Sequence, residues 1–260
     1  MVSGFLKIYK GRAAKSTENT FFRDFAGQLS QLFKDKGING LLIGFPECKE
    51  DNTLAPDVLL VTEHAVLIID FKNYDDGGTI TLPSEDYFNN GAWFFSKNDN
   101  EIIVKGGSYS NPFKQVGQHR FKMIDLIRDS VAGFNPRHLT TSVLFQNDIK
   151  IKGTVIRKLR NMFFVSDAKS YLNDIYDYIN VIDPEISLTS DTMQQILEYF
   201  TVEEYSVSPI SNGSIVPVVD KSPVVKTLTP KIITNNPDTM EQALKDDLKK
   251  AESIDIATAY

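Results

Sequence analysis

Residues 55–74, Ala-Pro-Asp-Val-Leu-Leu-Val-Thr-Glu-His-Ala-Val-Leu-Ile-Ile-Asp-Phe-Lys-Asn-Tyr, decide the fold of this chain. Two apolar runs separated by a short polar break are typical of an antiparallel hairpin. A carboxylate, which such strands usually exclude, accompanies each run: Asp57 comes directly before the first run, and Asp70 lies inside the second. Alternate residues of a strand share a face, so we expect the ammonium of Lys72 to lie beside the carboxylate of Asp70.

Secondary-structure patterns on both sides of this hairpin alternate between strands and helices. A helix capped by Ser16 or Thr17 carries an apolar stripe up to Gly37, and a second opens at Asn111-Pro112 and runs to Gly133. Further helices are expected at 168–179 and 191–200. Strands are expected at 5–9, 40–45, 139–145 and 162–165, with a meander of antiparallel strands at 79–82, 93–95 and 102–105. These patterns predict an α/β fold with a mixed sheet.

Composition narrows the class of protein. The chain has 260 residues, 42% of them hydrophobic, which is enough for one sizeable core and a small second unit. No run approaches the length of about 18 apolar residues that spans a membrane, and the first residues do not resemble a signal peptide. We therefore expect a cytoplasmic protein with no membrane partner. One cysteine and three histidines without metal-ligand spacing imply that oxygen atoms hold any metal.

Charge is divided unevenly along the chain. Residues 1–160 carry 21 Lys and Arg against 18 Asp and Glu, whereas residues 161–260 carry 7 against 16. The mildly basic first part hints at a polyanionic ligand despite the net charge of −6. The candidate nucleic-acid-binding residues are the densest basic cluster and one cation of the second long helix: Lys150, Lys152, Arg157, Lys158, Arg160 and Arg120. A solvated helix face is the alternative reading for the cations of that helix.

Four residues have the chemistry that phosphodiester hydrolysis requires: Glu18, Asp57, Asp70 and Lys72. Carboxylates hold a hard divalent cation, the backbone carbonyl of Phe71 can add a neutral ligand, and the lysine can orient water and offset growing negative charge. Each residue also has a structural explanation. Glu18 suits the first turn of any helix, and Asp57 follows a proline at a strand entry. Asp70 and Lys72 could form an exposed ion pair at a strand end.

Two histidines and the tryptophan are expected to be structural. We expect His64 and His119 on the surface or on a helix face rather than acting as general bases. Trp93 is expected in the core rather than on a base-stacking surface.

The sequence resembles the nuclease-related domain (NERD) branch of the PD-(D/E)xK nucleases. The resemblance rests on Pro56-Asp57, on Asp70-Phe71-Lys72, and on residues that follow in the expected order: Glu18, Gly77-Gly78, Trp93 and Asn111-Pro112-Phe113-Lys114-Gln115. It implies a restriction-endonuclease-like core, with a central mixed β-sheet flanked by helices. It also implies Asp57 and Asp70 as Mg²⁺ or Mn²⁺ ligands, Lys72 as the catalytic lysine, and Glu18 and Gln115 beside the metal. The family more often has Glu where this chain has Asp70.

The domain organisation expected from sequence has three parts. Residues 1–205 form the NERD-like domain, 206–236 a linker rich in Ser, Pro, Val and Thr, and 237–260 the start of a second, truncated domain resembling phospholipase D-like modules. NERD-type domains are often joined to helicases, so a helicase module in the same or a partner chain is expected, in bacterial genome defence or repair.

Three functions remain open on the sequence. The first is an Mg²⁺-dependent DNA endonuclease or nicking enzyme, with RNA as an alternative substrate. The second is a catalytically silent nucleic-acid-binding module with the same fold. The third is an interaction or assembly domain whose acidic second part docks a partner, and a homogeneous homo-oligomer indifferent to DNA would point to it.

Overall fold

A computed structural model describes residues 4–13, 16–128, 131, 134–135, 139–180 and 187–207 of the chain. All of them belong to the first of two compact units, Met1–Ser211. The expected second domain at 237–260, and the expected linker from residue 208 onward, lie outside the described residues.

The central sheet has seven strands in the order β11-β9-β5-β4-β2-β1-β13. Their bounds are β1 Phe5–Lys10, β2 Asn39–Gly44, β4 Val58–Thr62, β5 Val66–Lys72, β9 Leu139–Phe145, β11 Phe163–Ser166 and β13 Glu203–Glu204. The hairpin predicted from residues 55–74 is present, because β4 pairs antiparallel with β5. Strands β5, β9 and β11 are mutually parallel, and so are β1 and β2. The predicted mixed sheet is therefore confirmed.

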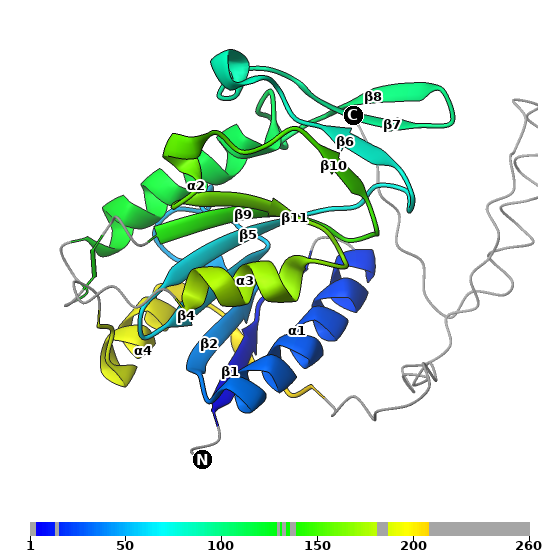
Figure 1. Ribbon diagram of the computed structural model, residues 1–260. Helices are drawn as coiled ribbons and strands as arrows, with labels where there is room; N and C mark the ends of the chain where they lie inside the picture. Colours follow the sequence, from blue (N-terminus) through cyan, green and yellow to red (C-terminus); the bar gives the residue numbers. More distant parts are fainter. Residues whose placement is uncertain are drawn as a thin grey trace, which may run out of the picture. The chain divides into compact units, whose positions relative to one another are not determined.

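Helices cover both faces of this sheet (Figure 1). The helices are α1 Ser16–Lys36, α2 Pro112–Ile127, α3 Tyr171–Ile179 and α4 Ser190–Glu198. Odd-numbered residues of β5, such as Leu67, Ile69 and Phe71, pack with α1 and α3, whereas Val66 and Ile68 pack with α2 and α4. Both faces of β5 are therefore buried, which explains its nearly uninterrupted apolar run.

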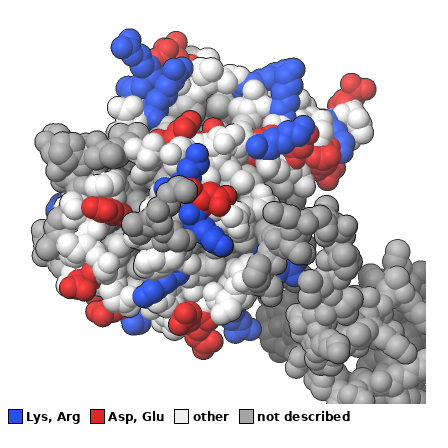
Figure 2. All heavy atoms as spheres, turned by 60° about the horizontal axis from the view of Figure 1, so that its bottom comes forward, with Lys and Arg blue, Asp and Glu red and all other residues white. Residues whose placement is uncertain are grey.

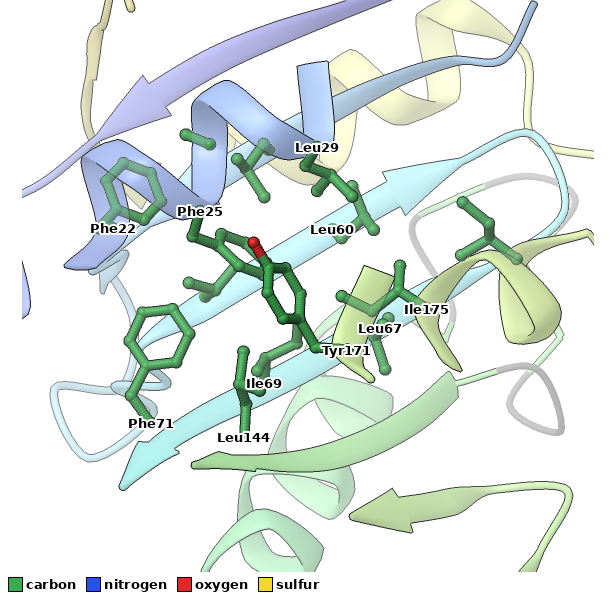
Figure 3. Packing of buried hydrophobic residues seen from close by; sticks show 14 of the residues in the cluster. Phe22, Phe25, Leu29, Leu60, Leu67, Ile69, Phe71, Leu144, Tyr171 and Ile175 are labelled. Atoms are coloured by element: carbon green, nitrogen blue, oxygen red, sulfur yellow. The ribbon is translucent and has the colours of Figure 1, made fainter. Parts of the chain in front are cut away.

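Aromatic side chains fill the layer between the sheet, α1 and α3 (Figure 3). The rings of Phe25 and Phe71 meet nearly edge to face, with centroids 5.5 Å apart, and Phe25 also contacts Tyr171 of α3. Phe21 makes a second edge contact with Phe71 at 4.9 Å. These contacts fix the first turns of α1 against the end of β5.

A second sheet lies beyond the end of β5. It has four strands in the order β10-β6-β7-β8, with bounds β6 Thr79–Thr81, β7 Trp93–Lys97, β8 Asn100–Val104 and β10 Lys150–Lys152. The predicted antiparallel meander is present in β6, β7 and β8. Strand β10, which is short and flanked by charge, was not predicted from the sequence, nor was the separation of this sheet from the central one.

Smaller elements complete the described part of the chain. They are the paired strands β3 Glu47–Cys48 and β12 Phe200–Thr201, and the 3₁₀ helices η1 Glu85–Tyr87 and η3 Arg157–Leu159. Trp93 is fully buried, as predicted. Among the described residues, no helix is long and apolar enough to cross a membrane.

Candidate active site

Two aspartates meet at one end of the central sheet. The antiparallel register of β4 and β5 sets Val58 opposite Ile69, so the next pair outward is Asp57 and Asp70. The backbone N–H of Phe71 donates to Asp57 Oδ2 at 2.6 Å. The hairpin therefore places two carboxylates side by side, although they are 13 residues apart in the sequence.

Asp70, Lys72 and Gln115 form a closed set of polar contacts. Lys72 Nζ lies 2.6 Å from Asp70 Oδ2, and the two side chains are only 13% and 3% exposed. Gln115 Nε2 donates to Asp70 Oδ1 at 2.7 Å, and Gln115 Oε1 accepts from Lys72 Nζ at 3.0 Å. The expected placement of an ammonium beside the Asp70 carboxylate is thus present, as a buried pair rather than an exposed one.

Gln115 reaches this set because α2 begins at the same end of β5. Asn111 is fully buried and caps the helix, accepting from the backbone N–H of Lys114 at 2.9 Å. Its amide donates in turn to the carbonyl oxygens of Asn89 and Gly91. Pro112 occupies the first helical turn, where a missing N–H costs little. The segment before β7 therefore anchors the helix start, and with it Gln115.

Glu18 approaches the site from the opposite face of the sheet. It lies in the first turn of α1, the helix that packs against Phe71, and its side chain is half-buried. Its charge raises the pKa of both Asp57 and Asp70. Both long helices therefore begin at the site, α1 with a carboxylate and α2 with an amide, and their N-termini favour negative charge there.

Negative charge is in excess at this strand end. Burial raises the pKa of Asp57 to about 7, the charge of Asp70 adds to the shift, and the Phe71 hydrogen bond and Lys72 oppose it. Burial also raises the pKa of Asp70, although the charge and hydrogen bond of Lys72 lower it. One ammonium is therefore not enough to compensate the buried carboxylates.

This donor set fits a divalent cation in its chemistry. Two adjacent carboxylates with uncompensated charge are the ligands that Mg²⁺ prefers, and Mg²⁺ usually keeps several waters rather than requiring a full protein cage. Among the described residues, no three His, Cys, Asp or Glu side chains form a group that could hold a metal. Asp57 and Asp70 are thus brought together, but Glu18 does not complete a cluster of three carboxylates with them.

The predicted basic cluster lies on the second sheet and the loop after it. Lys150 and Lys152 are in β10, Arg157 and Lys158 are in η3, and Arg160 follows; all five side chains are exposed. Strand β10 follows β9 closely, and the N–H of Gln146, just after β9, donates to the carbonyl oxygen of Lys72 at 2.9 Å. The cluster is therefore connected to the site end of the sheet by a short loop.

Charge elsewhere is less concentrated. Arg120 is half-buried, and its Nε donates to the carbonyl oxygen of Leu139 at 2.8 Å, which ties α2 to the start of β9. On the face drawn in Figure 2, the described Lys and Arg side chains are interspersed with Asp and Glu. That face offers no broad surface of a single sign among the described residues.

Two residues near the site were not identified correctly from the sequence. Of the two positions expected for His119, the helix face is correct and the surface is not: it lies in α2 but is 7% exposed, and burial, together with Lys122 and Lys72, lowers its pKa to about 4. Its position one turn after Gln115, on the buried side of α2, was a usable signal. Gly106 was missed altogether; a Cβ there would lie 2.2 Å from the carbonyl oxygen of Asn111 and 2.9 Å from Gln115 Cβ.

Comparison with known proteins identifies a family that matches the chain. The family described as the nuclease-related domain, NERD, matches residues 18–146, a range that begins at Glu18 and includes Asp57, Asp70, Lys72 and Gln115. No curated protein and no solved structure shows significant similarity to the chain.

Proposed function

Because the chain belongs to the nuclease-related domain family through residues 18–146, we propose that it is a divalent-metal-dependent nuclease that hydrolyses phosphodiester bonds of DNA. The observation that carries the proposal is the apposition of Asp57 and Asp70 at the end of β5, with Lys72 and Gln115 in direct contact with Asp70. Structural ion pairs rarely bury two carboxylates against one ammonium, because the uncompensated charge costs stability.

In this proposal, Asp57, Asp70 and the carbonyl oxygen of Phe71 hold Mg²⁺ or Mn²⁺, with Glu18 near it. The ion would polarise the scissile phosphate and lower the pKa of a bound water. Lys72 supplies a positive charge that offsets the charge growing on the phosphate, and its ammonium orients the attacking water. Gln115 holds both Asp70 and Lys72, so its role is to position them.

The exposed basic cluster supports a nucleic-acid substrate. Lys150, Lys152, Arg157, Lys158 and Arg160 are free of acidic partners within ion-pair distance among the described residues. Cations of this kind bind the phosphate backbone without reading sequence. We propose that they hold the DNA that the site cleaves.

A plasmid assay tests the proposal. Purified protein with Mg²⁺ or Mn²⁺ should nick or cut supercoiled DNA, and EDTA should abolish the reaction. Asp70→Asn and Lys72→Met should each lower the rate by about a hundredfold or more. Asp99→Asn, a matched change at an exposed turn, should leave the rate unchanged. Cleavage that persists in Asp70→Asn would contradict the proposal.

One observation favours a second candidate, the catalytically silent nucleic-acid-binding module. Lys72 and Gln115 already engage both oxygens of Asp70, so a metal must compete with them. Two results would identify this function. The wild-type protein would bind DNA in the presence of Mg²⁺ or Mn²⁺ but cut neither DNA nor RNA, and the Asp70→Ala variant would bind DNA with the same affinity as wild type.

We also propose a role in bacterial defence or repair beside a helicase module, because NERD-type domains are often joined to helicases and residues 251–260 resemble the opening of phospholipase D-like modules. Co-purification of the protein with its cellular partners, followed by an ATP-dependent unwinding assay, tests it separately from the nuclease activity.

A further inference from the structure

Strand β8 leaves one edge of the second sheet open. It is the last strand in the order β10-β6-β7-β8, and within the described residues it pairs only with β7. Ile102 and Ile103, which point to opposite faces of the sheet, are 52% and 50% exposed. The opposite edge strand, β10, carries the exposed Lys150 and Lys152, which discourage pairing with another chain. The β8 edge has no such protection between Ile102 and Val104.

The β7–β8 turn determines which backbone groups face this edge. Asn98 and Asp99 have φ values of 50° and 62°, which are typical of a two-residue type I′ hairpin turn, and Lys97 pairs with Asn100 across it. In such a turn the N–H of Asn100 points toward β7. Backbone groups alternate between the two sides of a strand, so those of Glu101, Ile103 and Lys105 point to the open edge.

The side chains along this edge are complementary to themselves. In an antiparallel pair centred on Ile103, each Ile103 faces its copy and Ile102 faces Val104. Glu101 then lies opposite Lys105 at both ends of the pair. Opposite charges at directly opposed positions stabilise such a pair, whereas like charges destabilise it.

From these three features we infer that β8 pairs antiparallel with β8 of a second copy of this chain, joining two four-stranded sheets into one sheet of eight strands. The β7–β8 hairpin lies at the outer edge of its sheet in Figure 1, as this pairing requires. One strand pair buries little area, so the dimer is weak and forms reversibly with concentration.

Disulfide trapping tests the pairing and its register. Ile103→Cys should form an intermolecular disulfide under mild oxidation, because the two residues 103 face each other. Ser96→Cys is the matched control, since it lies on the same face of the same sheet but in the internal strand β7. Wild-type protein, whose single cysteine, Cys48, is buried, should stay uncrosslinked. Equal trapping of the 103 and 96 variants, or none in either, would overturn the inference.

A charge exchange measured by sedimentation velocity gives an independent readout. Glu101→Lys and Lys105→Glu should each weaken the dimer by about tenfold, because like charges then oppose each other at both ends. The double variant should restore wild-type association. Lys34→Glu, at the exposed end of α1, is the control and should leave association unchanged. A monomeric wild type at all concentrations, or a double variant no better than the singles, would contradict the pairing.

Discussion

At the scale of single residues, the site combines groups that are costly to bury with contacts that keep them in place. Asp57 accepts from the Phe71 N–H, Asp70 contacts Lys72 and Gln115, and burial is the main cause that raises the pKa of both carboxylates. In the absence of a bound cation, such a site lowers the free energy of unfolding of the protein. This loss of stability can be measured.

Asp57→Asn should stabilise the metal-free protein. The pKa of Asp57 is raised from 3.8 to about 7, so between these values the folded state holds a proton that the unfolded state has lost. The free energy of unfolding therefore falls as pH rises through this window, and the loss is complete above about pH 7. Urea denaturation in EDTA at pH 8 should show a gain of up to about 4 kcal/mol for the variant, and none at pH 4.

Asp99→Asn, at the exposed β7–β8 turn, is the matched control for this measurement. If Asp57→Asn were less stable than wild type at pH 8, the carboxylate would be stabilising the fold, and the argument from excess charge would fail.

At the scale of elements, the site depends on where α1 and α2 begin. Asn111 and Pro112 start α2 so that Gln115 faces the end of β5, and Gly106 allows the preceding segment to approach the helix closely. Residues without reactive groups therefore set the geometry of the reactive ones.

Two glycine substitutions in this region should have opposite effects. Gly106→Ala introduces a Cβ only 2.2 Å from the carbonyl oxygen of Asn111, so the start of α2 must shift and both stability and cleavage should fall. Gly117 lies inside the same helix, α2, and a Cβ added there would have no neighbouring group within 4 Å beyond the backbone of its own helix. In Gly117→Ala the free energy of unfolding should therefore rise by about 0.5–1 kcal/mol, with the rate of cleavage unchanged. Thermal denaturation and the plasmid assay together measure both; equal effects of the two variants would refute the positioning role of Gly106.

At the scale of the whole molecule, two sheets meet beyond the end of β5, with the carboxylates at the end of the first and exposed cations on the second. This arrangement predicts that DNA binding and DNA cleavage are separable.

A variant that reverses Lys150, Lys152 and Lys158 to Glu should bind DNA more weakly and with a shallower dependence on salt, because fewer counterions are released. Lys34→Glu, distant in sequence and on α1, is the control. Unchanged affinity and salt dependence in a fluorescence anisotropy titration would exclude the cluster from the DNA-binding surface.

Sequence patterns sufficed for the elements with strong periodicity. The β4–β5 hairpin, the starts of α1 and α2, and the strands β9 and β11 were predicted correctly, because each shows a clear alternation, cap or apolar run. The contact of Lys72 with Asp70 followed from the two-residue period of a strand. Short elements such as β10 and β3 were missed because two or three residues carry no period. The close approach at Gly106 depends on tertiary packing that no local pattern encodes, whereas the position of His119 one turn after Gln115 was a signal of its burial.

We propose that Asp57 and Asp70 together bind a divalent cation. Anomalous diffraction from crystals grown with Mn²⁺ tests it most directly, because the signal locates the ion independently of any activity. We expect a peak in direct contact with one oxygen of each aspartate, and its loss in Asp70→Asn crystals. A fully ordered site with Lys72 and Gln115 still engaging Asp70, and no Mn²⁺ between the two carboxylates at saturating metal, would contradict it.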